Sequence, residues 1–167
     1  GVSMFVDDWS FKIEGYDAIP YGAMICTKAG VNVSINTDGV SGLPSLAIDA
    51  AKVMRYGGLS EDQALAMLTI NPAKELGVDH RVGSLEVGKD GDVVIWDGHP
   101  LSVYSRVNTT IIEGQPYFQR RDAFGVNPIS TLKTSLDKNA HRKPLNIREG
   151  NTYAIAGATV YPVSGPK

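Results

Sequence analysis

The chain has 167 residues, of which 43% are hydrophobic and 20% charged, and its formal charge at neutral pH is −2. This composition can bury a core, which excludes a disordered chain, and the near-neutral charge provides no basic surface for nucleic acid or an anionic membrane. No apolar run reaches the roughly 18–20 residues that cross a bilayer. Together, the charge and the short apolar runs mean that neither nucleic acid nor a membrane is expected as a partner.

The first third of the chain predicts two strands joined by a helix. Residues 2–6 form a short apolar run, which is typical of a buried strand. Residues 17–29 carry apolar side chains at helical spacing, with Pro20 in the first turn and Gly30 as the stop. Residues 31–38 then alternate apolar and polar side chains, as a strand does. Strand, helix and strand in this order predict a parallel βαβ unit.

Three further helices are predicted in the middle of the chain, and their apolar positions are typical of a core. Residues 46–54 are rich in Ala, Ile, Val and Met and are followed by a pair of glycines. Ser60 and Gln63 have the spacing of a capping box at the start of the second helix. Asn71 is predicted to cap the third, with a proline in its first position, and Gly77 to end it.

The pattern then changes from helical to strand-like. Residues 83–87, 92–96 and 107–113 are short β-type runs separated by glycine-containing turns, which predicts a small antiparallel module. Residues 119–151 are polar and irregular and are interpreted as a linker. Residues 153–160 are again strand-like.

Few side chains stand out as chemical groups. The three histidines, His80, His99 and His141, have no metal-ligand spacing and are interpreted as loop residues. The single cysteine, Cys26, excludes an internal disulfide framework and is interpreted as a small buried hydrophobe. The sequence therefore contains no recognisable nucleophile and no histidine-based metal set of its own.

Carboxylates at predicted strand ends are the remaining candidates. Asp7 and Asp8 follow the first strand, where they could bind a cation, act as acid and base, or lie in a solvated loop. Asp38 ends the second strand, and the carboxyl ends of strands line the active-site mouth of closed α/β barrels. A carboxylate there can ligate a divalent metal and accept a proton, but it could equally be an ordinary loop or helix-cap residue.

Four ordered motifs resemble a known family. The segments S-I-N-T-D, Y-G-G-L-S, T-I-N-P-A-K and V-G-S-L-E-V-G-K-D-G-D, at residues 34–38, 56–60, 69–74 and 82–92, are similar to the closing third of a metal-dependent amidohydrolase. The resemblance is to the imidazolonepropionase-like and prolidase-like branch, and it extends from residue 1 to about residue 120.

The resemblance implies an α/β fold. Residues 1–77 would be the last strands and helices of a (β/α)8 TIM-like barrel, and residues 78–120 would be strands of a small β-sandwich domain. Residues 121–151 would be a linker. Residues 152–167 would be an extra strand, either the start of a second amidohydrolase unit in tandem or an edge strand of the first.

The resemblance also implies a function. Asp38 would be a metal ligand and proton shuttle at the end of the eighth barrel strand, and the other expected ligands are expected in segments that precede Gly1. The full-length parent would hold a divalent metal, zinc by resemblance, and hydrolyse C–N bonds of an amide, cyclic amide or dipeptide. The alternative is a non-catalytic structural fragment, inactive without the missing barrel half or self-association. The chain begins without an initiator Met or a charged segment and is expected to be cut at its front, so no compartment is predicted.

Overall fold

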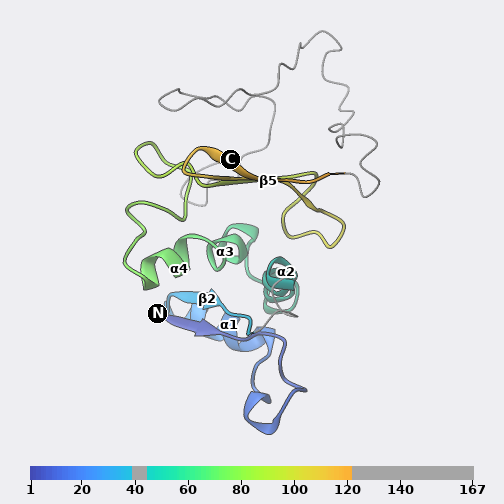
Figure 1. The fold of residues 1–167 in the computed structure, drawn as a ribbon. Coiled ribbons are helices and arrows are strands. Elements are labelled where there is room, and N and C mark those ends of the chain that lie inside the picture. Colours follow the sequence, from blue (N-terminus) through green and yellow to red (C-terminus); the bar gives the residue numbers. More distant parts are fainter. Residues whose placement is uncertain (39–44, 122–167) are drawn as a thin grey trace. The chain divides into compact units, whose positions relative to one another are not determined.

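The computed structural model describes residues 1–38 and 45–121, shown in colour in Figure 1. They divide into two compact units. The first unit contains Gly1–Lys89 and Pro100–Tyr104, and the second contains Asp90–His99 together with residues 105–121. The expectations for the linker and the extra strand concern residues 122–167 and lie outside the described residues.

The first unit is built around two parallel strands, β1 (Val2–Met4) and β2 (Val33–Ile35), which lie side by side in Figure 1. A short 3-10 helix, η1 (Ile13–Gly15), and the helix α1 (Pro20–Lys28) connect them. The parallel strand–helix–strand arrangement is therefore confirmed, and the unit is of the α/β class. Both strands are three residues long, shorter than the sequence pattern predicted.

The ends of α1 follow from local chemistry. Pro20 occupies the first helical position, where its missing amide hydrogen has no helical partner to lose. At the other end Gly30 has a φ of 81°, and its amide donates to the Thr27 carbonyl at 3.0 Å. The next amide, of Val31, donates to the Cys26 carbonyl at 3.0 Å. These two bonds close the helix in a Schellman motif and send the chain into β2.

Three helices follow β2, namely α2 (Leu46–Gly57), α3 (Glu61–Ala66) and α4 (Ile70–Glu75). The predicted capping box at the start of α3 is confirmed. The Gln63 amide donates to Ser60 Oγ at 3.2 Å, and the Ser60 amide donates to Gln63 Oε1 at 2.9 Å. A capping residue of this kind stabilises a helix by about 1 kcal/mol.

The prediction that Asn71 caps α4 is wrong. The helix begins at Ile70, two residues before the predicted first position at Pro72, and Thr69 precedes it without a side-chain capping bond. The Asn71 side chain instead donates to the Val33 carbonyl at 2.8 Å, and the Asn32 side chain donates to the Asn71 carbonyl at 3.0 Å. Asn71 therefore joins α4 to β2, a long-range role that local capping rules do not anticipate.

The core of the first unit draws on both strand segments and on the helices. Its buried members are Val6, Ala23, Val33, Ile35, Ala50, Val53, Leu59, Ala64, Leu65, Met67 and Leu101. Ser34 is also buried, and its hydroxyl donates to Glu75 Oε2 at 2.7 Å. All three residues of β2 are buried although one is polar, because a parallel strand is covered on both faces.

The segment at residues 83–87 is not the strand that the sequence pattern predicted. Residues 83 and 84 lie in bends and residue 87 in a turn, and Gly83 has a φ of 94°. A Cβ at Gly83 would lie 2.8 Å from the Ala73 Cβ and 2.9 Å from the Ile70 Cα, so the backbone passes very close to α4. This contact explains why the chain turns here instead of extending.

The second unit is an antiparallel sheet of three strands in the order β3 (Val93–Trp96), β4 (Val107–Ile112) and β5 (Gln115–Gln119). The strands β3 and β4 were predicted, whereas β5 was not. A tight turn joins β4 to β5 through Glu113 and Gly114, whose φ values are 50° and 75°. Positive φ at both positions is the type I′ geometry that suits the twist of a hairpin.

Candidate functional site

A cleft of about 260 Å³ lies at the carboxyl ends of the two parallel strands. Asp38 lines it, three residues beyond the end of β2, and its side chain is exposed to solvent. The cleft is lined by Phe5, Val6, Asp7, Asp8, Asn36, Thr37, Asp38, Ser45, Asp49 and Lys52. The carboxyl edge of the strands thus gathers four carboxylates and one ammonium group.

The register of the strand pair brings Asp7 to the same edge as Asp38. Met4 lies opposite Ile35, and the amide of Asn36 continues the ladder by donating to the Met4 carbonyl at 2.9 Å. Asp7 and Asp38 follow these two strand ends, and both line the cleft. Asp7 and Asp8 lie in an exposed loop that borders the cleft. This location is compatible with both alternatives for the pair, a solvated loop and a chemical site.

Lys52 of α2 lines the cleft and contacts carboxylates from two segments. Its Nζ forms an ion pair with Asp7 Oδ2 and another with Asp49 Oδ1, the latter at 3.0 Å. The second oxygen of the buried Asp49 accepts from the Ser45 hydroxyl at 3.1 Å. Burial alone would lower the pKa of Lys52, but its hydrogen bonds to Asp7 and Asp49 outweigh this effect and raise the pKa above 10.5. Lys52 is therefore cationic at neutral pH.

The donor set of this cleft fits a divalent metal only in part. The Asp38 carboxylate is a suitable oxygen ligand, and its exposure leaves it accessible. Within residues 1–38 and 45–121, however, no group of three or more His, Cys, Asp or Glu side chains is arranged to hold a metal ion. The described part of the chain can therefore supply one ligand but not a complete metal centre.

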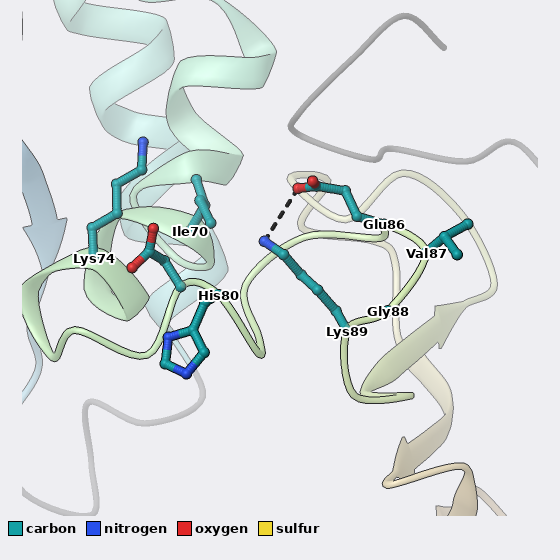
Figure 2. Close-up of a pocket in the computed structure, with 8 residues that line it drawn as sticks. Ile70, Lys74, His80, Glu86, Val87, Gly88 and Lys89 are labelled. Carbon is teal, nitrogen blue, oxygen red and sulfur yellow. Dashed lines mark ion pairs between the residues drawn. The ribbon is translucent and has the colours of Figure 1, made fainter.

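A second hollow, of about 530 Å³, lies between α4 and the turns that follow it (Figure 2). Lys89 and Glu86, both on the turn that borders it, form an ion pair at 3.1 Å, and Lys89 also donates to Ser84 Oγ at 2.6 Å. The His80 ring points away from this pair (Figure 2). Of the charged residues that line this hollow, Lys89 and Glu86 therefore neutralise each other.

The other side chains that the sequence singled out lie apart from the cleft. His80 lies in a turn and His99 in the loop that follows β3, and His141 is outside the described residues. Cys26 is a half-buried free cysteine on α1 and packs against the core. None of these side chains lines the cleft that contains Asp38.

Sequence reasoning missed Asp49 and Lys52. They lie three residues apart on α2, whose inward face is otherwise apolar. A charged pair at this spacing in a core-like helix is a detectable signal, since a buried carboxylate requires a partner. Their connection to Asp7, 45 residues from Lys52 in the sequence, is visible only in the tertiary structure.

Comparison with known families supports the sequence resemblance. The sequence signature of the amidohydrolase family matches residues 22–127, more than half of the chain. The chain belongs to the amidohydrolase family. None of the helices in the described residues of this family member is long and apolar enough to cross a membrane.

Three curated relatives illustrate the similarity of this amidohydrolase chain. The amidohydrolase tasK of Hapsidospora irregularis is 31% identical over 70% of this chain and 12% of its own length. A 5-methylthioadenosine/S-adenosylhomocysteine deaminase of Thermoanaerobacter pseudethanolicus is 33% identical over 68% of this chain and 32% of its own. The imidazolonepropionase of Maricaulis maris is 42% identical over 41% of this chain and 18% of its own. The chain thus spans less than a third of each of these relatives.

Two solved structures resemble the fold. An amidohydrolase from Thermotoga maritima MSB8 has a TM-score of 0.61 and 40% identity, over 65% of this chain and 28% of its own. An adenosine deaminase from Xanthomonas campestris with bound zinc has a TM-score of 0.53 and 27% identity, over 70% of this chain and 32% of its own. The similarity to both structures agrees with the family assignment made from sequence.

Proposed function

We propose that this chain supplies the closing part of a metal-dependent hydrolase that acts on C–N bonds of small molecules. The observation that carries the proposal is the position of Asp38, exposed in a cleft at the carboxyl ends of two parallel strands, in a chain of the amidohydrolase family. In closed α/β barrels this edge of the sheet is where active sites lie.

The proposed architecture has two parts. The parallel pair and its helices are the last strands and helices of a (β/α)8 barrel, with β1 as its seventh strand and β2 as its eighth. The three-stranded antiparallel sheet belongs to a small β-sandwich. The similarity to the Thermotoga maritima amidohydrolase, with a TM-score of 0.61, supports this arrangement.

Asp38 has two roles in the proposed reaction. It is one ligand of a divalent cation, proposed to be zinc because one similar structure contains zinc. The cation, when bound, makes water a nucleophile at neutral pH. As a bond forms between the water oxygen and the substrate carbon, the Asp38 carboxylate accepts the water proton. It then donates that proton to the leaving nitrogen as the C–N bond breaks, so the carboxylate is regenerated.

The substrate is proposed to be an amide, a cyclic amide, a dipeptide or an amino group on a heterocycle. The names of the relatives support this range, since they include imidazolonepropionases and 5-methylthioadenosine/S-adenosylhomocysteine deaminases. These reactions share one step, the attack of water on a carbon bonded to nitrogen. A panel of one compound from each class is therefore the appropriate first assay.

A second candidate function is a non-catalytic structural piece. The observation that favours it is that the described residues contain no group of three side chains able to hold a metal. In that case Asp38 is a solvated loop carboxylate, and the chain contributes only packing to a partner or a second copy.

The substitution Asp38→Asn in the protein that carries this chain separates the two candidates. It removes the charge and the proton acceptor but keeps the shape, so hydrolysis should fall by about 10³-fold and bound metal should decrease. Asp62→Asn is the matched control, because Asp62 is an exposed carboxylate on α3 that does not line the cleft. Unchanged hydrolysis and metal content in Asp38→Asn would refute the proposed role of Asp38.

A further inference from the structure

We infer that Lys52 is a positioning residue: it fixes the segment after β1, through Asp7, beside Asp38. The inference rests on the proposed function, because it concerns the geometry of the same cleft. Lys52 belongs to α2, Asp7 follows β1 and Asp38 follows β2, so the cluster brings together three separate parts of the chain.

On α2, the Asp49 carboxylate anchors the Lys52 ammonium group. Asp49 has only 6% of its surface exposed, and the apolar residues Ala50 and Val53 that follow it on the helix are fully buried. Both Asp49 oxygens have partners, with Oδ1 accepting from Lys52 Nζ at 3.0 Å and Oδ2 from Ser45 Oγ at 3.1 Å. The Lys52 ammonium is thus held by a carboxylate that packing keeps in place.

Lys52 links Asp49 to the segment that follows β1. Lys52 Nζ also donates to Asp7 Oδ2, which makes it a bridge between a buried and a more exposed carboxylate. Only 28% of the Lys52 side chain is exposed, compared with 42% of that of Asp7, so the bridge lies partly out of solvent. The chain just before Asp7 is fixed by Val6, which is 1% exposed in the core.

The loop that begins at Asp7 is closed by its own hydrogen bonds. The Asp8 amide donates to the Ala18 carbonyl at 3.2 Å, and the Phe11 amide donates to the Asp8 carbonyl at 3.0 Å. These bonds close a compact loop whose two ends meet beside the Lys52 contact. Without the bridge, the loop would retain few contacts to hold it at the cleft, because its large side chains, including Trp9 and Phe11, are exposed.

Lys52 therefore acts on the reaction through Asp7 and not by contact with the reacting atoms. Its positive charge is compensated by two carboxylates, which leaves it poorly suited to bind an anionic substrate. Its effect should appear in the rate of the chemical step, because a small displacement of an active-site edge misaligns reacting groups even when binding is retained.

Hydrogen exchange is the measurement that tests the positioning role without reference to activity. In Lys52→Met the amides of Asp8 and Phe11 should exchange at least about tenfold faster, while those of Ala64 and Met67 in the α3 region keep their rates. Lys52→Arg restores the bridge and should restore slow exchange. Unchanged exchange at Asp8 and Phe11 in Lys52→Met would overturn the inference.

A second variant guards against general unfolding, since Lys52→Met leaves the buried Asp49 without its charge partner. The double variant Asp49→Asn/Lys52→Met removes both charges from the helix and still breaks the link to Asp7. It should show the same local increase in exchange with α2 intact. Loss of protection throughout α2 in this double variant would assign Lys52 to folding and would also overturn the inference.

Kinetics complete the test in the protein that carries the chain. Lys52→Met should lower kcat by about tenfold or more with KM changed less than about threefold, and Lys52→Arg should recover most of the rate. If Asp38→Asn abolishes hydrolysis while Lys52→Met leaves kcat unchanged, the inference fails and the proposed function stands. If Asp38→Asn has no effect, the proposed function fails, whatever hydrogen exchange shows for Lys52.

Discussion

The two units of this chain are stabilised in different ways. Every buried side chain among the described residues belongs to the first unit, where two short strands and four helices share an apolar core. In the second unit no described side chain is buried, and all five residues of β5 are exposed. The apolar residues Val94, Tyr117 and Phe118 of its sheet remain open to solvent.

The difference shows what each unit depends on. The first depends on apolar packing, which is worth roughly 25 cal/mol for each Å² removed from water. The second depends on its ladder of main-chain hydrogen bonds and on polar contacts at its turns, such as the 2.8 Å ion pair between Arg120 and Asp97. A sheet of this size needs a packed face for independent stability, so the second unit should be the less stable.

The largest effect should come from truncating the core of the first unit. Met67 is fully buried, so Met67→Ala should lower the free energy of unfolding by about 2–5 kcal/mol. In the second unit Val94 is 47% exposed, and Val94→Ala should change stability by no more than about 0.5 kcal/mol. Urea denaturation, with hydrogen exchange as the readout in each unit, measures the stability change of each variant. Equal losses of stability in the two variants would contradict the difference between the units.

A smaller effect should come from a glycine that packs against α4. Gly83 and Gly88 both have a φ of 94°, but an added Cβ at Gly83 would collide with α4, whereas at Gly88 it would meet nothing within 4 Å. Both alanine substitutions should lower stability by the backbone penalty of about 1–2 kcal/mol for a positive φ. Gly83→Ala should lower it further, because its Cβ would also clash with α4. Thermal denaturation of the pair isolates the packing term, and equal midpoints would show that the contact is relieved cheaply.

The smallest effect should be a pH dependence confined to the second unit. The Arg106 amide donates to Asp97 at 2.7 Å, and this bond, together with Arg120, holds the pKa of Asp97 below 3.8 despite some burial. A carboxylate with a lowered folded-state pKa stabilises the fold above its unfolded pKa, and this contribution is lost as the pH falls through the folded value. The second unit should therefore lose stability below about pH 4.

The matched variants for this prediction are Asp97→Asn and Asp92→Asn. Asp97→Asn removes the titrating group and should flatten the loss of sheet signals in acid, as followed by NMR of the Arg106 amide. Asp92 accepts the Glu113 amide at 2.8 Å at another turn of the same sheet, so Asp92→Asn should keep the acid response. An acid response that persists in Asp97→Asn would assign it to other carboxylates.

Much of the fold could be predicted from the sequence because its signals are local. The capping box of Ser60 and Gln63 and the stop at Gly30 involve residues within a few positions of one another. The same holds for the strand–helix–strand order and for the turn at Glu113, where backbone preference decides the geometry. The position of Asp38 after a parallel strand also follows from such local signals.

The errors have a common physical cause. Asn71 was predicted to cap a helix, but it bonds to the Val33 carbonyl 38 positions away. Residues 83–87 have the composition of a strand, but the close approach of Gly83 to α4 makes them turn. The strand β5 was missed because its exposed sequence Q-P-Y-F-Q, with two adjacent aromatic residues, carries no alternating apolar pattern, and pairing with β4 alone establishes it.

The sequence by itself thus determined the family, the α/β class and the carboxylate at the end of the second strand. Only the tertiary structure decided that Asp7 and Asp38 line the same cleft and that Lys52 joins Asp7 to the buried Asp49. The reason is that helix and turn preferences act over a few residues, whereas an ion pair across 45 residues forms only after packing has brought two segments together.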